Sequence, residues 1–245
     1  MKIFSHRGSH EAAQENSWAA FSKSVTEGAT GIELDIIESK DGHGIIIHDD
    51  NILNLTGVDK NISECSLDEI QAFTLNDKSP IPTLDQVLER LLPLTELNLE
   101  IKQASVDFIK KTASKILSSP FQNKVVFSSF ELPYVKLLRE NFPKLNTALL
   151  WDKNSDLQEI LQTMKDLGTT RLHLCSENIT EEIKAGFHAC GWTLWIWFPL
   201  ENHDELDPQK RALNLDPRID CIITNHPASY TREELNSLNL TEPSA

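Results

Sequence analysis

Short apolar segments alternate with longer amphipathic segments along almost the whole chain. The apolar segments have the length and composition of buried β-strands, and the segments between them carry apolar residues at the spacing typical of helices. We expect strands at about 2–6, 31–37, 97–101, 124–128, 147–151, 170–174, 192–198 and 220–224. We expect helices at about 16–27, 83–92, 105–118, 131–141, 156–167, 180–190, 203–213 and 229–238.

The number and order of these elements indicate a closed barrel. Eight strands, each followed by a helix, are the elements of a (β/α)₈ barrel. A doubly wound open sheet is the alternative, but eight such units within 245 residues favour closure. The sequence therefore predicts an α/β fold, a (β/α)₈ TIM barrel that forms a single domain over residues 1–240, with a frayed polar tail at 241–245.

One stretch after the second strand does not follow the alternation. Gly44–His48 is expected to pair back as an extra strand after a turn at Lys40–Gly42. Residues 51–82 then predict an inserted segment with a small helix near Leu67–Phe73. We expect this segment to lie over one end of the barrel.

Two carboxylates on the second strand raise an electrostatic question. Because alternate side chains of a strand share a face, Glu33 and Asp35 lie together on one side, about 6.5–7 Å apart along the strand. The other side carries Ile32, Leu34 and Ile36, which we expect to pack outward against helices. Two inward anions in a buried strand are costly unless a cation, either a basic side chain or a metal ion, accompanies them.

A third carboxylate lies on the strand at 97–101, in the segment LNLEIK. Strand alternation turns Asn98, Glu100 and Lys102 inward. Three carboxylates from neighbouring strands are hard oxygen ligands that suit Mg²⁺ or Ca²⁺. Lys102 could contact a phosphate as a point charge, and its alternative role is a salt bridge to Glu100 with no metal.

Two histidines also fall at strand ends, where barrels of this kind carry their active sites. His6 ends the first strand in the sequence Ser-His-Arg-Gly, and His48 ends the apolar run IIIH. A single strand-end histidine is more often a hydrogen-bonded structural residue. Two imidazoles near a metal-bound phosphate, however, can serve as general base and general acid. The neighbouring Asp49 could orient a histidine or cap the following loop, and we favour the cap.

The segment WTLWIWF places three tryptophans on the expected strand at 192–198. Aromatic residues this dense are mostly core residues. Trp197, near the strand end, could also form a wall against the alcohol or sugar portion of a substrate.

Composition and charge narrow the choice of partners and compartment. The formal net charge of −14 argues against a general nucleic-acid or anionic-membrane surface, and the apolar runs are too short for stable membrane insertion. A phosphate substrate would therefore need local positive charge in the cleft. The four cysteines are widely scattered without metal-binding spacing, which predicts free thiols in a reducing compartment. The N-terminus enters a strand directly, so we expect a cytoplasmic protein.

Together these motifs resemble those of a known family. The segment HRGSHEAAQENSWAAFSKSVTEGATGIELDIIESKDGHGIIIHD is similar to the N-terminal signature of the glycerophosphodiester phosphodiesterases, which has HRG, a PENT-like box, a Glu-x-Asp strand, a KDG turn and an HD pair. The resemblance continues through IPTLDQVL, LNLEIK, FSSF, the tryptophan-bearing seventh strand and DCIITNHP. It covers essentially the whole chain in order.

The resemblance implies a barrel that hydrolyses glycerophosphodiesters, its small-molecule substrates, to an alcohol and glycerol 3-phosphate. It implies that one divalent cation, Mg²⁺ or Ca²⁺, is held by Glu33, Asp35 and Glu100. It also implies that His6 and His48 are the catalytic acid–base pair, that Arg7 and Lys102 hold the phosphate, and that residues 51–82 cover the site and help to select the substrate. Water and the glycerol 2-hydroxyl are both open as the attacking group.

The sequence also departs from the family pattern. The box lacks its proline, and Leu200 and Asn225 stand where the family usually has asparagine and aspartate. We expect these changes to affect the alcohol side of the site and not the metal or the histidines. Two alternative functions are a phospholipase D-like activity on lysophospholipids or sphingomyelin and a non-catalytic phosphate-binding barrel.

Overall fold

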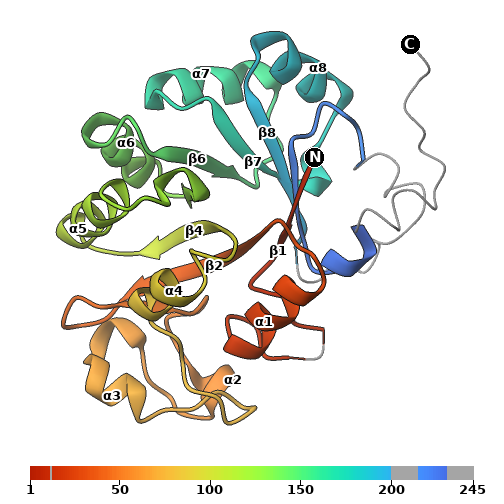
Figure 1. Cartoon of the computed structure of the whole chain (residues 1–245). Helices are drawn as coiled ribbons and strands as arrows, with labels where there is room; N and C mark the ends of the chain where they lie inside the picture. Colours follow the sequence, from red (N-terminus) through yellow and green to blue (C-terminus); the bar gives the residue numbers. More distant parts are fainter. Residues whose placement is uncertain (12, 200–214, 231–245) are drawn as a thin grey trace.

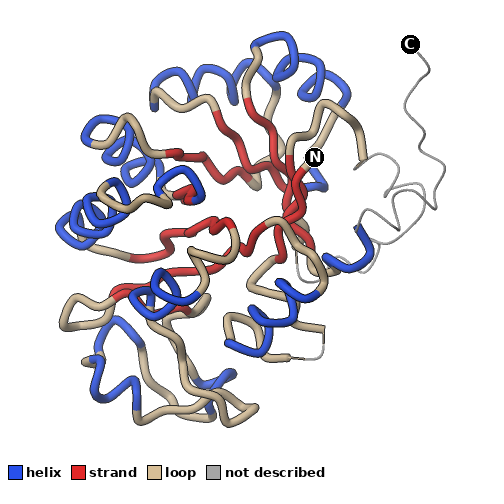
Figure 2. Tube along the Cα trace, viewed as in Figure 1, coloured by secondary structure: helices blue, strands red, loops and turns tan. Residues whose placement is uncertain are grey.

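The computed structural model describes residues 1–11, 13–199 and 215–230, and within them the strands close into a barrel surrounded by helices (Figures 1 and 2). The barrel strands are β1 (Lys2–Ser5), β2 (Gly31–Glu38), β4 (Glu96–Gln103), β5 (Val125–Ser129), β6 (Asn146–Trp151), β7 (Arg171–Cys175), β8 (Thr193–Trp197) and β9 (Cys221–Thr224). Each is parallel to its neighbours, and β1 pairs with both β9 and β2, which closes the ring. The predicted TIM barrel is confirmed.

Helices follow the strands, as the alternation predicts. The barrel helices are α1 (Trp18–Thr26), α4 (Leu84–Arg90), α5 (Val106–Leu117), α6 (Leu132–Asn141), α7 (Leu157–Leu167) and α8 (Glu181–Cys190), and short 3₁₀ turns lie at Ile62–Glu64, Gln122–Lys124, Ser176–Asn178 and Pro227–Tyr230. Local chemistry sets several of their ends. Thr83 and Gln86 form a capping box at the start of α4, whereas Gly168 ends α7 in the left-handed conformation. The helix expected at 203–213 and nearly all of that expected at 229–238 lie outside the described residues, as does the tail.

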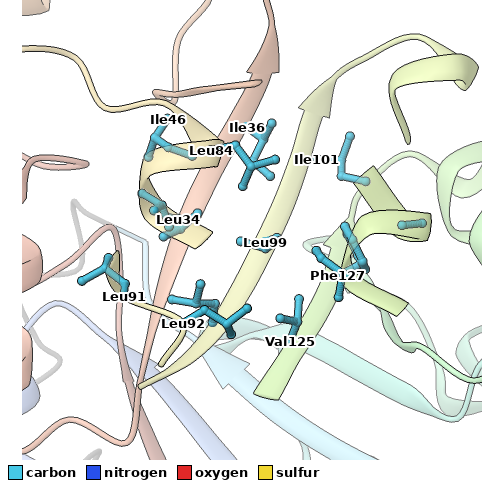
Figure 3. Close-up of a cluster of buried hydrophobic side chains, with 14 of the residues drawn as sticks. Leu34, Ile36, Ile46, Leu84, Leu91, Leu92, Leu99, Ile101, Val125 and Phe127 are labelled. Atoms are coloured by element: carbon cyan, nitrogen blue, oxygen red, sulfur yellow. The ribbon is translucent and has the colours of Figure 1, made fainter. Parts of the chain in front are cut away.

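Strand alternation sorts the side chains as expected. Leu34, Leu99 and Ile101 point outward into a cluster that includes Leu84 of α4 and Phe127 of β5 (Figure 3). Each is buried, which stabilises the docking of helices on the outer surface of the barrel. The side chains at the alternate positions of β2 and β4 therefore face the barrel interior.

The inserted segment has a small core of its own. The predicted extra strand is β3 (Gly44–Ile46), antiparallel to β2, and the predicted small helix is α3 (Leu67–Gln71). A further short helix, α2 (Leu53–Thr56), lacks a sequence signal of its own. These elements share an apolar cluster of Ile37, Ile45, Ile47, Ile52, Ile62, Cys65, Ile70, Leu75 and Ile81. The cluster attaches the insertion to the β2–β3 hairpin and so fixes the chain on both sides of His48.

Aromatic rings fill the barrel interior below the strand ends. The ring of Phe4 lies 4.8 Å from that of Trp195, which stacks on His173 at 4.4 Å. All three side chains are buried. Gly31 packs directly against Phe4, and no larger residue fits at this position, because a Cβ there would lie 2.3 Å from the Phe4 ring.

The cysteines and the helices bear on two expectations from the sequence. All four cysteines are unpaired, and Cys190 alone among them is exposed. Across the described ranges, no helix combines the length and apolar character needed to cross a bilayer.

The close approach of Gly31 to Phe4 gives a test of the barrel interior. Gly31→Ala should lower the free energy of unfolding by about 1–3 kcal/mol, because the added methyl group overpacks a core that cannot yield easily. Denaturant unfolding measures the change. Phe4→Leu in the Gly31→Ala background should recover part of the loss, which a double-mutant cycle separates from the cost of Phe4→Leu alone. An unchanged denaturation midpoint for Gly31→Ala would show that the contact is absent.

Candidate active site

A cleft of about 490 Å³ opens at the carboxyl ends of the strands. Its residues come from seven of the barrel strands or the loops after them, from the loop after β3 and from the inserted segment. They are His6, Arg7, Glu15, Glu33, His48, Asp49, Leu55, Asn98, Glu100, Lys102, Phe130, Leu150, Trp197, Pro199 and Ile223. One part of the lining is ionisable, Asn98 adds a polar amide, and the remaining residues are apolar.

Three carboxylates meet at the cleft, which Glu33 and Glu100 line and Asp35 adjoins, because β2 and β4 are parallel neighbours that keep one register from Gly31 to Ile36. Glu33 pairs with Asn98, and Asp35 pairs with Glu100. An oxygen from each of Glu33, Asp35 and Glu100 lies within 4.8 Å of those of the other two, and all three residues are buried. In the part of the chain that the structure describes, this is the one acidic or histidine cluster with metal-site geometry.

The donor set fits a hard divalent cation. Glu33 accepts a 2.9 Å hydrogen bond from the Arg7 backbone N–H through Oε2, while its buried Oε1 has no hydrogen-bond partner. A buried carboxylate oxygen without a partner is costly, and a cation held between the three groups would satisfy it. Carboxylate oxygens without sulfur or nitrogen favour Mg²⁺ or Ca²⁺ over softer metals.

Burial and mutual repulsion divide the protonation behaviour of the three acids. Burial, followed by the charges of Asp35 and Glu100, holds the pKa of Glu33 well above its usual value. Burial and the Asp35 charge raise the pKa of Glu100 to about 7. Burial also opposes ionisation of Asp35, but the positive charges around it, Arg7 foremost, outweigh that effect and hold its pKa below the usual value. Asp35 is therefore the carboxylate that stays ionised without a metal.

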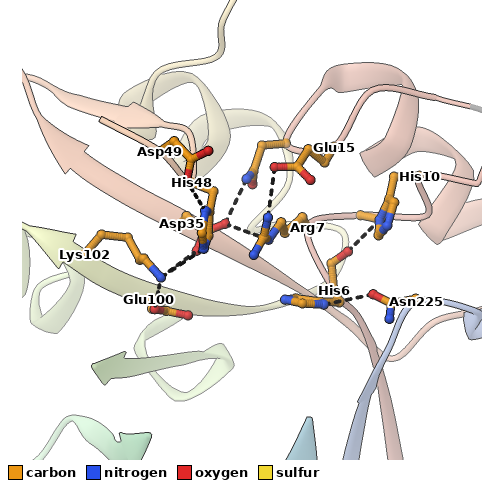
Figure 4. Close-up of polar contacts among 12 residues, drawn as sticks. His6, Arg7, His10, Glu15, Asp35, His48, Asp49, Glu100, Lys102 and Asn225 are labelled. Atoms are coloured by element: carbon orange, nitrogen blue, oxygen red, sulfur yellow. Dashed lines mark hydrogen bonds and ion pairs between the residues drawn. The ribbon is translucent and has the colours of Figure 1, made fainter. Parts of the chain in front are cut away.

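Arg7 and Lys102 supply positive charge on two sides of this cluster (Figure 4). Arg7 Nε lies 3.4 Å from Asp35 Oδ2, and its Nη1 donates to Glu15 at 3.0 Å. Lys102 Nζ lies 2.7 Å from Glu100 Oε1, so the salt bridge considered for this lysine does form. This salt bridge does not provide a partner for Glu33 Oε1. A metal site at the three carboxylates is therefore compatible with the salt bridge.

Asn16, in the PENT-like box after β1, holds Asp35 in place through a hydrogen bond. The sequence analysis did not predict this role. Asn16 Nδ2 donates to Asp35 Oδ2 at 2.9 Å, and the Asn16 backbone N–H donates to the Arg7 carbonyl at 2.9 Å. Arg7 and Asn16 both adopt positive φ angles, of 56° and 54°. Such backbone conformations are uncommon for residues other than glycine and cluster at functional sites. The likeness of the box to PENT was the available signal.

His6 is enclosed at the end of β1. Burial, followed by the positive charge of Arg7, lowers its pKa to about 3, so the ring is neutral. Its Nδ1 lies 2.9 Å from Asn225 Oδ1, and its Nε2 lies 4.0 Å from Glu33 Oε2. The expectation that the change at Asn225 spares the histidines is therefore wrong, because closure of the barrel brings the end of β9 beside the end of β1.

His48 approaches from the opposite side of the carboxylates. Its Nδ1 lies 2.6 Å from Asp49 Oδ1, and its Nε2 lies 3.2 Å from Lys102 Nζ. The expected loop cap at Asp49 is wrong, since this carboxylate orients His48. The next residue, Asp50, holds the loop instead by accepting hydrogen bonds from the backbone N–H and hydroxyl of Ser63.

The rest of the cleft is apolar. Trp197 lies at the end of β8, edge-on to Phe130 with ring centroids 5.9 Å apart. Leu55 of α2 also lines the cleft, so the insertion does reach the site. Of the other tryptophans, Trp195 lies in the barrel interior and Trp192 packs against Phe187, as expected for core residues.

Comparison with known proteins gives one consistent family. The sequence model of the glycerophosphoryl diester phosphodiesterase family matches residues 6–229. A glycerophosphodiester phosphodiesterase from Caldanaerobacter subterraneus subsp. tengcongensis is 28% identical over 236 residues, which cover 92% of this chain and 94% of that protein.

Solved structures agree with this family. The structure of a glycerophosphodiester phosphodiesterase from Thermotoga maritima has a TM-score of 0.74 at 26% identity and covers 96% of each chain. That of an Oleispira antarctica phosphodiesterase in complex with the product sn-glycerol-3-phosphate has a TM-score of 0.81 at 20% identity and covers 98% of this chain and 97% of its own. Because the family match includes every residue of the cleft, the chain belongs to the glycerophosphoryl diester phosphodiesterase family.

Proposed function

We propose that the protein hydrolyses glycerophosphodiesters to an alcohol and glycerol 3-phosphate, with a divalent cation and a pair of histidines. Family membership makes the protein a phosphoric diester hydrolase. The observation that carries the mechanism is the cluster of three buried carboxylates, of which Glu33 and Glu100 line one cleft with His6 and His48.

Glu33, Asp35 and Glu100 would hold the cation. When bound, a divalent ion supplies a Lewis acid that polarises a phosphoryl oxygen and offsets charge in the transition state. Arg7 and Lys102 add positive charge at the edge of the cluster, where both side chains line the cleft. This local positive charge offsets, within the cleft, the net charge of −14, which would otherwise repel an anionic substrate.

The surroundings of the two histidines suit opposite roles. His6 is neutral and faces Glu33 with Nε2, so it can take a proton from the attacking oxygen. The Asp49 carboxylate at Nδ1 orients the His48 ring, so that His48 can serve as the proton donor to the departing alkoxide. We therefore assign His6 as the general base and His48 as the general acid.

The apolar side of the cleft supports a role in holding the organic part of the substrate. Trp197, Phe130 and Leu150 offer contact surface without charge. The related Oleispira antarctica enzyme was solved with glycerol 3-phosphate, which fits a small, water-soluble product. We also propose a cytoplasmic location, which the unpaired cysteines support.

The direct test of this function is a hydrolysis assay with controlled metal. Metal-stripped protein should release little glycerol 3-phosphate from glycerophosphocholine or glycerophosphoethanolamine, and Mg²⁺ or Ca²⁺ should restore release. Faster turnover of lysophosphatidylcholine would favour the phospholipase D-like alternative. Binding of glycerol 3-phosphate in saturating metal without any turnover would contradict hydrolysis and favour a non-catalytic barrel.

The histidine roles predict the behaviour of two variants. His6→Ala and His48→Ala should each lower kcat by about 10²–10⁴-fold, because each removes a positioned proton-transfer group. Steady-state assays with saturating metal measure the loss. His43→Ala is the matched control, since His43 is not among the residues of the cleft. Wild-type turnover in either of the first two variants would reject the roles.

The raised pKa values predict that metal binding releases protons. The ion needs ionised carboxylates, but at pH 6 Glu100, with a pKa of about 7, is mostly protonated in the metal-free protein. Affinity for Mg²⁺ or Ca²⁺ should therefore fall as the pH drops below about 7. Calorimetry in two buffers of different ionisation enthalpy counts the protons. Identical binding enthalpies at pH 6 would contradict the prediction, and Glu100→Gln should release fewer protons than the wild type.

A further inference from the structure

Asn225 joins two segments that meet beside the proposed base. It follows β9 and is buried. Its Nδ2 lies 3.1 Å from the backbone carbonyl oxygen of Pro199, and its Oδ1 lies 2.9 Å from His6 Nδ1. Figure 4 shows the amide beside the His6 ring, on the side away from Glu100 and Lys102. The amide therefore connects the segment after β8 with the end of β1.

The Pro199 contact determines which way the amide points. A backbone carbonyl only accepts hydrogen bonds, so the amide atom that faces Pro199 must be the NH₂ group. The oxygen of Asn225 must then face His6. This assignment follows from the donor and acceptor chemistry of the neighbours and does not depend on distinguishing nitrogen from oxygen by shape.

The amide orientation in turn determines the tautomer of His6. An amide oxygen only accepts, so His6 Nδ1 must carry a proton to bond with it. In a neutral ring the other nitrogen, Nε2, then carries a lone pair. That nitrogen is the one that faces Glu33, at 4.0 Å from Oε2. The unprotonated nitrogen is thus turned toward the carboxylate cluster, where a base is needed.

The backbone holds this geometry in place. The His6 backbone N–H donates to the Thr224 carbonyl at 2.9 Å, one residue before Asn225. β1 and β9 pair in register over the four residues that precede this point. The side chains of His6 and Asn225 therefore project from paired strand ends that cannot shift independently. This pairing keeps the contact between them in place.

We propose that Asn225 is a positioning residue that holds His6 in the Nδ1–H tautomer, with the Nε2 lone pair turned toward Glu33, because its own NH₂ group is committed to the Pro199 carbonyl. The catalytic benefit rests on the proposed function of His6 as the base. The tautomer itself does not.

An aspartate at this position would act differently. It has no N–H for the Pro199 carbonyl, and it would place a carboxylate oxygen against that carbonyl at hydrogen-bond distance, where the two oxygens repel each other. The side-chain amide of Asn225 and the backbone carbonyl of Pro199 therefore suit each other. In this chain they form one unit that supports His6.

Ring nitrogen spectroscopy tests the tautomer without any assay. In metal-free protein with ¹⁵N-labelled histidine, the His6 signals, identified by their loss in His6→Ala, should show a protonated Nδ1 and an unprotonated Nε2. Asn225→Ala should convert the ring to a mixture of tautomers or to Nε2–H. The matched control is Asn146→Asp. This change also removes a hydrogen bond from a side-chain amide to a backbone carbonyl, that of Val125, at a residue outside the cleft. It should leave the His6 signals unchanged.

Kinetics supply the second readout. Asn225→Ala should lower kcat on the order of 10- to 100-fold, the range seen when the partner that orients a functional histidine is lost, with KM nearly unchanged. Asn225→Asp keeps the shape and should still lower kcat. An Nε2–H tautomer in the wild type, or an unchanged tautomer in Asn225→Ala, would overturn the proposal. If the wild type shows the expected tautomer but no hydrolysis, the inference stands and the proposed function fails.

Discussion

Two neighbouring parallel strands, β2 and β4, hold three buried carboxylates within a few ångströms of one another at the active-site cleft. Burial alone would drive such groups to take up protons, and the raised pKa values of Glu33 and Glu100 show that effect. Arg7 and Lys102 neutralise part of the negative charge, but Arg7 also forms a salt bridge with Glu15. When all three carboxylates are ionised, they carry one negative charge more than Arg7 and Lys102 together can offset. That surplus is the physical basis for a divalent cation.

Much of the surrounding structure serves to maintain this arrangement. The left-handed backbone at Arg7 and Asn16 brings a main-chain N–H to Glu33 and an amide to Asp35. The inserted segment, stabilised by its own apolar cluster, fixes the chain around His48. Barrel closure brings Asn225 to His6. The two histidines thus approach the carboxylates from different supports, a loop on one side and a strand end on the other, which gives them different electrostatic surroundings.

Local sequence patterns predicted the parts of this account that depend on periodicity. The parity of GIELDI and LNLEIK placed the carboxylates inward and the isoleucines and leucines outward, because a strand has only two faces. Contacts between residues distant in sequence were not predictable in this way. The bond between Asn225 and His6 spans nearly the whole chain and exists only because the barrel closes. Asp49 was misjudged because a choice between adjacent partners depends on side-chain rotamers, which a pattern of residue types does not specify.

The central claim is that Glu33, Asp35 and Glu100 share one divalent cation, and anomalous X-ray diffraction tests it most directly. Crystals grown with Mn²⁺ as a substitute for Mg²⁺ should show a single strong anomalous peak in the cleft, within about 2.0–2.6 Å of an oxygen from each carboxylate, the range of hard-cation bonds. A cleft without a peak in saturating metal, with Lys102 lying between the three acidic groups, would contradict the claim.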